Sequence, residues 1–203
     1  MKGKFNTQLN EEQKAAKNLI LENQIVIITG RAGTGKSILC AQASVDLLNK
    51  RRVTQVLITR ATIEVGASMG FLPGGMGEKF NPYLEAFMEN VTKCSDKVTP
   101  ELFKAYPVQF IRGKTIDDIL IVEEAQNLTK AQMLAVLTRL GKNGKIVING
   151  DNEQKDIRDE YNGLSYAIEL SKRIPEIKWV KLKENHRSDI VGRILDLEYK
   201  GPC

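Results

Sequence analysis

A glycine-rich stretch that ends in a lysine and a serine carries the clearest chemistry in this sequence. Residues 30–37 read GRAGTGKS, and an apolar run at residues 25–28 leads into them. Glycines let the backbone turn so that successive N–H groups point at an anion, and a helix start is a natural anion site. Lys36 can bring its charge to the β- and γ-phosphates of a nucleotide, and the Ser37 hydroxyl can ligate Mg²⁺. The pattern predicts a nucleotide site made of Gly30, Arg31, Ala32, Gly33, Thr34, Gly35, Lys36 and Ser37.

Two carboxylates, Glu123 and Glu124, follow a second apolar run, ILIV. The carboxyl ends of parallel strands meet at one edge of a sheet, so both side chains are expected beside the phosphate loop. One can hold Mg²⁺, and the next can orient or deprotonate an attacking water. We assign Glu123 to the metal and Glu124 to the water. A third apolar run, residues 145–149, precedes GDNEQ, in which Gln154 can sense the γ-phosphate.

Runs of β-branched residues alternate with helical patterns along the chain. Strands are expected at 25–28, 53–59, 108–111, 119–123, 145–149 and 177–182, and helices at 9–22, 37–49, 82–90, 129–140, 164–174 and 188–199. Asn10 and Ser188 are the expected N-caps of the first and last helices, and a weaker helix begins near Thr99. The alternation predicts an α/β fold in which a mostly parallel sheet has helices on both faces.

The chain shows neither an internal repeat nor a linker, so residues 1–203 are expected to form one domain. The Gly-rich segment 61–80 is expected to be a functional loop that exposes Met69, Phe71 and Leu72. These three residues are candidates for a nucleic-acid contact or a subunit contact.

Composition indicates a globular cytoplasmic protein. Hydrophobic residues make up 42% of the chain, and no apolar run is long enough to span a bilayer. The N-terminus lacks the apolar core of a signal peptide, and three widely spaced cysteines fit a reducing compartment. The lone His186 cannot form a histidine metal site by itself. The net charge of +5 permits an anionic partner such as RNA or DNA, although a mildly basic solvated surface is the more common explanation.

The ordered set of motifs resembles the PhoH-like ATPases, relatives of the superfamily 1 helicase motor core. The resemblance covers residues 9–197 and rests on LNEEQ, GRAGTGKS, LITRA, GFLPGGMGEKFNPYLEAF, FIRGKT, VEEAQN, LTRLGKNGK and INGDNEQKD. It implies a three-layer P-loop NTPase fold of the RecA-like type, with ATP and Mg²⁺ as ligands. It also implies ATP hydrolysis coupled to binding or unwinding of RNA or single-stranded DNA.

The resemblance assigns further roles to individual residues. Gln13 is similar to the helicase glutamine that reads adenine. Arg60, in LITRA, resembles a motif that faces nucleic acid in helicases, and Arg112, in FIRGKT, is a second candidate for a nucleic-acid contact. The segment that contains Arg187 loosely matches the helicase N-Y-R-S motif, whose arginine reaches the γ-phosphate, and Arg193 is the alternative. By the same comparison Lys36, Glu124, Gln154 and Arg187 form the catalytic set.

Two further expectations follow, one from a departure from the family pattern and one from a difference from superfamily 1 helicases. The family usually has Asp where this chain has Glu123, so we expect Mg²⁺ binding to survive and hydrolysis to be slower or differently tuned. A superfamily 1 helicase closes ATP between two RecA-like domains, and this chain has room for one. We therefore expect a neighbouring copy to supply the second wall and an arginine finger. The resemblance suggests a hexameric ring.

Other functions remain open from the sequence. An ATP-dependent assembly or switch protein would hydrolyse slowly and would have no nucleic-acid substrate. A small-molecule kinase needs a lid and an acceptor pocket, and the GDNEQ element has no obvious role in one. A GTPase is disfavoured because the chain has no N-K-x-D segment for reading guanine.

Overall fold

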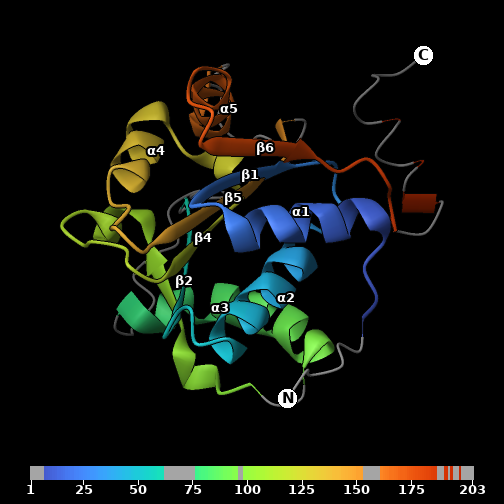
Figure 1. Ribbon diagram of the computed structural model, residues 1–203, viewed down its shortest axis with the longest axis horizontal. Coiled ribbons are helices and arrows are strands. Elements are labelled where there is room, and N and C mark those ends of the chain that lie inside the picture. The colour runs from blue at the N-terminus through green and yellow to red at the C-terminus, as the bar shows by residue number, and fades with distance from the viewer. Residues whose placement is uncertain are drawn as a thin grey trace.

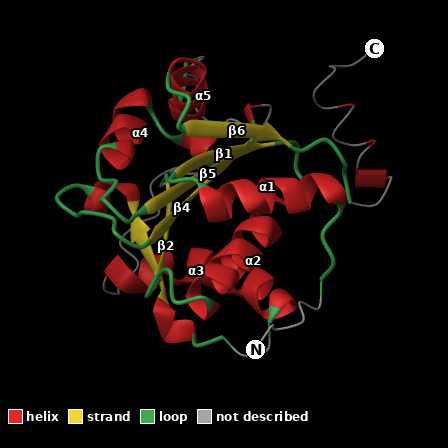
Figure 2. Ribbon diagram, in the orientation of Figure 1, coloured by secondary structure: helices red, strands yellow, loops and turns green. Residues whose placement is uncertain are grey.

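A parallel six-stranded sheet runs through the middle of the molecule (Figures 1 and 2). The computed structural model describes residues 7–61, 76–95, 98–152 and 161–186 and positions 190, 191, 193 and 197, with the backbone alone at 76–81. Across the sheet the strands are β3 (Phe103–Pro107), β2 (Val56–Arg60), β4 (Ile119–Glu123), β5 (Lys145–Gly150), β1 (Ile25–Thr29) and β6 (Ile177–Lys181). All five neighbouring pairs are parallel. Their carboxyl ends therefore share one edge.

Helices cover both faces of this sheet, as the alternating sequence pattern predicts. One face packs against α1 (Glu11–Glu22), α2 (Lys36–Asn49) and α3 (Met76–Cys94), and the other against α4 (Lys130–Leu137) and α5 (Gly163–Arg173) (Figure 1). Side chains of a strand alternate between the two cores, so Ile121 lies in one and Leu120 in the other. Burial on both sides explains why β4 is apolar up to its last residue.

Reciprocal capping boxes mark where two of the described helices begin. The Asn10 side chain accepts a hydrogen bond from the Gln13 N–H, and the Gln13 side chain accepts one from the Asn10 N–H. Asn10 is thus the N-cap that the sequence predicts. Thr129 and Gln132 form the same reciprocal capping box at the start of α4. Each box satisfies two backbone donors that a helix start leaves without partners.

The structure corrects two predicted elements. Residues Val108–Ile111, predicted as a strand, form the short 3₁₀ helix η2, and the edge strand β3 precedes them. β3 is only partly buried, so it has no continuous apolar run, whereas Val108 and Ile111 are both buried at a spacing of three. The sequence predicts a helix start at Pro82, but α3 begins at Met76 and continues through Pro82 to Cys94. Proline is common at helix starts, which makes it a misleading signal here.

Some predictions fall on residues that the structure does not describe. They include Ser188 and residues 62–75, with Met69, Phe71 and Leu72 among them. Positions 190, 191, 193 and 197 are helical, in agreement with the helix predicted there. The weaker helix near Thr99 is the short 3₁₀ helix η1 (Pro100–Leu102). Within the described part of the chain, no helix is long and hydrophobic enough to cross a membrane.

Candidate functional site

The phosphate loop connects β1 to α2 at the carboxyl edge of the sheet. Gly33 and Gly35 have φ angles of 90° and 83°, in the left-handed region that glycine adopts without steric cost. Gly35 is the N-cap of α2 and makes no side-chain capping bond. The first N–H groups of α2 are therefore not capped by a side chain at this position, and the helix dipole adds partial positive charge there. The loop has the geometry of an anion site.

Lys36 is folded back over this loop. Its Nζ donates hydrogen bonds to Gly30 O at 2.6 Å and Arg31 O at 3.2 Å. Burial lowers the pKa of Lys36 from its ordinary value, and the carboxylates of Asp151, Glu124 and Glu123 oppose that shift. The lysine thus lies near both the phosphate loop and the carboxylates at the ends of β4 and β5.

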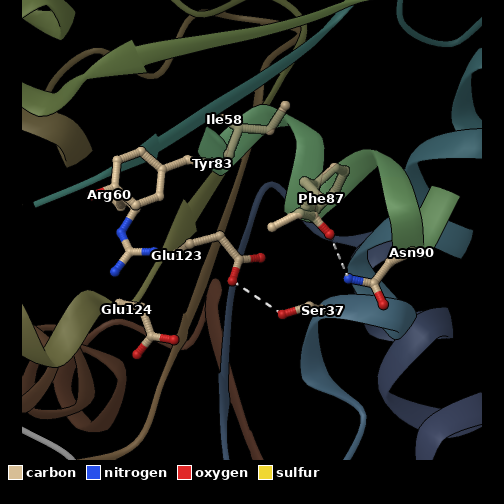
Figure 3. A pocket seen from close by; sticks show the side chains of 9 residues that line it. Ser37, Ile58, Arg60, Tyr83, Phe87, Asn90, Glu123 and Glu124 are labelled. Atoms are coloured by element: carbon tan, nitrogen blue, oxygen red, sulfur yellow. Dashed lines mark hydrogen bonds between the residues drawn. The ribbon is translucent and has the colours of Figure 1, made fainter. Parts of the chain in front are cut away.

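Glu123 lies between Ser37 and Asn149. The Ser37 hydroxyl donates to Glu123 Oε2 at 3.1 Å, a contact that Figure 3 shows, and Asn149 Nδ2 donates to Glu123 Oε1 at 3.0 Å. The strand order places β5 between β1 and β4, so the end of β5 brings Asn149 beside both Glu123 and Ser37. Sequence reasoning missed Asn149, which is only 2% exposed. The one available signal was a polar residue at the end of an apolar strand.

The donor set around Glu123 suits Mg²⁺. Burial, and then the neighbouring charge of Glu124, raise the pKa of Glu123 to about 7. A divalent cation would favour the ionised carboxylate, and the Ser37 hydroxyl is a second hard oxygen ligand. The described residues contain no cluster of three or more His, Cys, Asp or Glu that could hold a metal.

Glu124 adopts an unusual backbone conformation just after β4. Its φ of 51° and ψ of 46° are left-handed, which is uncommon for a residue other than glycine. Its carboxylate accepts a hydrogen bond from Gln126 Nε2 at 2.5 Å. Gln126 is fully buried, and its Oε1 accepts from the Asp151 N–H at 3.0 Å. Gln126 therefore links Glu124 to the residues after β5, a role that sequence reasoning did not assign.

Arg60 joins the same edge from β2, where its Cα pairs with that of Glu123. Its Cζ lies 4.3 Å from the centre of the Tyr83 ring. Arg60, Tyr83, Ser37, Glu123 and Glu124 line a cavity of about 170 Å³ (Figure 3). The buried Arg60 Nε has no hydrogen-bond partner in the described part of the chain. The structure thus places Arg60 beside the two carboxylates.

Arg112 lies elsewhere. It is exposed after η2 and lines a separate groove with α4 residues, among them Leu134, and with Arg139. The structure does not bring Arg112 together with the phosphate loop.

Gln13 lies against the phosphate loop from α1. Its Nε2 donates to Thr34 O at 3.0 Å, and the residue is 4% exposed. Gln154 and Arg187 lie outside the described residues, and Arg193 is helical and exposed. The chain just before Arg187 reaches the loop, because the His186 N–H donates to Gly33 O at 3.0 Å.

Sequence comparison identifies relatives over most of the chain. The PhoH-like protein family matches residues 7–198. A "PhoH-like protein" of Mycobacterium tuberculosis (strain ATCC 25618 / H37Rv) is 36% identical over 91% of this chain and 55% of its own length. "Protein PhoH" of Escherichia coli (strain K12) is 35% identical over 92% of this chain and 54% of its own length. The chain thus spans about half the length of these relatives.

Solved structures share the fold at low sequence identity. The large terminase from a thermophilic bacteriophage superposes with a TM-score of 0.62 at 12% identity, over 96% of this chain and 51% of the terminase chain. The Pif1 helicase from Candida albicans gives a TM-score of 0.50 at 20% identity, over 94% of this chain and 43% of the helicase chain. These likenesses support the predicted three-layer α/β, RecA-like P-loop fold. Fold, phosphate loop and sequence relationship agree, and the chain is a member of the PhoH-like protein family.

Proposed function

We propose that this chain binds ATP with Mg²⁺ and hydrolyses it. The observation that carries the proposal is the cluster of Ser37, Glu123 and Asn149 at the start of α2, with Glu124 and Lys36 beside it. These groups come from the start of α2 and from the ends of β4 and β5, which are distant in sequence. A loop that served only as a structural corner would not need two carboxylates and a buried amide next to its lysine.

Each group has a defined task in this proposal. The loop N–H groups and the Lys36 ammonium bind the β- and γ-phosphates. Ser37 and Glu123 would hold Mg²⁺, and the ion would neutralise charge that develops on the transferred phosphoryl group. Glu124 accepts the proton of the attacking water and is oriented by its hydrogen bond from Gln126. Gln154 senses the γ-phosphate, as the family resemblance implies.

Substitutions of Lys36 and Glu124 test this proposal. Trp179, the only tryptophan of the chain, donates its indole N–H to Thr29 Oγ1 at 2.9 Å, directly before the loop, so its fluorescence can report nucleotide binding. Lys36→Ala should abolish ATP binding. Glu124→Gln should still bind ATP, but its rate of phosphate release should be lower than that of wild type by about a hundredfold or more. Phosphate release by Glu124→Gln at the wild-type rate would refute the assignment.

We further propose a single-stranded polynucleotide, RNA or DNA, as the partner of the ATPase. Support comes from the net charge of +5 and from the exposed Arg112, with Arg139 on the same groove. ATP turnover with and without RNA and single-stranded DNA separates this from a slowly hydrolysing switch. Stimulation by a polynucleotide supports the motor, whereas a low, unchanged rate supports the switch.

Assembly into a ring is the last part of the proposal. The phosphate loop and the carboxylates lie at the carboxyl edge of the sheet, and in this proposal a neighbouring copy supplies the opposing wall and an arginine. Light scattering with and without ATP measures the oligomeric state. A monomer that hydrolyses ATP at an ordinary rate would rule out the ring as a requirement.

A further inference from the structure

The amide of Gln13 makes two hydrogen bonds inside the protein. Its Oε1 accepts from the Asn10 N–H at 3.0 Å and completes the capping box of α1. Its Nε2 donates to Thr34 O in the phosphate loop, also at 3.0 Å. With 4% of the residue exposed, the amide lies against the loop and does not project into open space.

The bond from Gln13 to Thr34 O fixes the orientation of one loop peptide. In a planar trans peptide, the Thr34 carbonyl and the Gly35 N–H point in opposite directions. A donor that holds this carbonyl from the α1 side therefore turns the Gly35 N–H away from α1. Packing here is close, since a Cβ added to Gly35 would lie 2.4 Å from Gln13 Nε2.

A second donor holds the neighbouring carbonyl. The His186 N–H binds Gly33 O at 3.0 Å. The segment that carries His186 is itself attached to α1, because the Glu12 carboxylate accepts from the N–H groups of Lys183 and Glu184 at 2.9–3.1 Å. Two successive loop carbonyls are thus held by one connected wall, formed by the start of α1 and residues 183–186.

We infer that Gln13 is a positioning residue for the phosphate loop, which orients the Gly35 peptide for phosphate binding whatever base the nucleotide carries. The inference rests on the proposed nucleotide-binding function. It differs from the adenine-reading role that the family resemblance implies. A base reader affects ATP alone, whereas a residue that sets the loop geometry affects every ligand that the loop binds.

Calorimetric titration of the full chain tests this inference with three ligands: Mg-ATP, Mg-GTP and inorganic tripolyphosphate with Mg²⁺. Gln13→Met removes both side-chain hydrogen bonds, and methionine has a similar volume to glutamine and is also uncharged. All three affinities should fall about five- to tenfold, and the ATP-to-GTP ratio should stay within about twofold of wild type.

Gln132→Met is the matched control, because Gln132 occupies the same capping-box position in α4. It should lower thermal stability by a similar amount and leave all three affinities unchanged. If Gln13→Met does not fold, Gln13→Asn keeps a neutral amide whose side chain is one methylene shorter, so it cannot reach both the Asn10 N–H and Thr34 O. It should weaken all three ligands with an unchanged ATP-to-GTP ratio.

The outcomes separate the alternatives. A loss confined to ATP, with GTP and tripolyphosphate affinities unchanged, would make Gln13 a base reader and overturn the inference. Unchanged affinities for all three ligands would overturn it as well, while leaving the proposed function intact. If the wild-type chain binds none of the three, the proposed nucleotide site fails and the inference fails with it.

Discussion

Asn149 donates a hydrogen bond to Glu123 across two neighbouring strands, with 3.0 Å between Nδ2 and Oε1. The Asn149 amide also lies 3.5 Å from Ser37 Oγ. It therefore fixes the carboxylate that, in our proposal, shares Mg²⁺ with the serine. The strand order makes this possible, because β5 lies between β4 and β1.

Asn149→Ala should lower the turnover number for ATP. A hydrogen bond to a charged group contributes about 1.5–3 kcal/mol, so kcat should fall about tenfold or more. Steady-state phosphate release at saturating ATP and Mg²⁺ measures this. The exposed Asn143→Ala is the control and should keep the wild-type rate. A kcat within twofold of wild type would show that Asn149 does not position Glu123.

Glu123→Asp should weaken Mg²⁺ binding, so the ATPase should need more Mg²⁺. The glutamate reaches both Ser37 and Asn149, and a side chain shorter by one methylene loses both contacts unless the backbone moves. We expect the Mg²⁺ concentration for half-maximal rate to rise about tenfold, which corresponds to about 1.4 kcal/mol. A Mg²⁺ titration of the rate decides it, with the exposed Glu101→Asp as control. Tighter Mg²⁺ binding and faster turnover would show that Asp, the residue usual in the family, suits this site better.

Gly35→Ala should abolish nucleotide binding, and Gly113→Ala should not. Both glycines have left-handed φ angles, 83° and 82°, so an alanine at either one carries backbone strain of about 1–2 kcal/mol. A Cβ at Gly113 meets nothing within 4 Å, whereas one at Gly35 meets Gln13 Nε2 at 2.4 Å. Urea unfolding measures the shared cost, and Trp179 fluorescence measures binding. Equal affinity in the two variants would contradict the close packing of Gln13 on the loop.

Lys145 should make stability rise with pH in the alkaline range. It is 6% exposed, and its Nζ donates to Ile20 O and Asn23 O at the end of α1. Burial, helped by the charge of Arg52, lowers its pKa from 10.5 to about 8. Between these two pH values the unfolded chain binds more protons at Lys145 than the folded chain does. The contribution of Lys145 to the free energy of unfolding therefore increases as pH rises.

Urea unfolding of wild type and Lys145→Met between pH 7.5 and 10.5 checks that sign. The stability difference, wild type minus variant, should increase by about 2 kcal/mol over this range. The exposed Lys142→Met should follow the wild-type curve throughout. Parallel curves for wild type and Lys145→Met would mean that the folded state does not perturb this lysine.

Substitutions of Arg60 and Arg112 should affect different activities, ATP hydrolysis for Arg60 and polynucleotide binding for Arg112. Arg60 lines the cavity beside Glu123 and Glu124, so Arg60→Gln should lower kcat even without a polynucleotide. Arg112 is exposed on another face, so Arg112→Gln should keep the basal rate and weaken polynucleotide binding by about tenfold or less. Fluorescence anisotropy with a labelled single strand gives the affinities. A basal rate unchanged in Arg60→Gln would remove Arg60 from the ATP site.

Local signals were enough for most of the fold. The apolar runs predicted five of the six strands, and Asn10 marked the start of α1. The edge strand β3 was missed because one side of it is partly exposed, which breaks the apolar run. Pro82 misled because a helix can continue through a proline when tertiary packing offsets the lost hydrogen bond.

The sequence by itself determined the phosphate loop, the carboxylates after β4 and the family, because each is a short run of residues whose spacing carries the chemistry. The tertiary structure decided which side chains meet. Asn149 reaches Glu123 through the strand order, Gln126 links Glu124 to Asp151, and Gln13 holds the loop from a different helix. Three of these contacts join residues that are 21 to 26 positions apart in the sequence, and the contact between Gln126 and Glu124 spans two positions across the left-handed backbone of Glu124. No local sequence pattern encodes them. Parallel strand order and helix packing place these groups within hydrogen-bond distance.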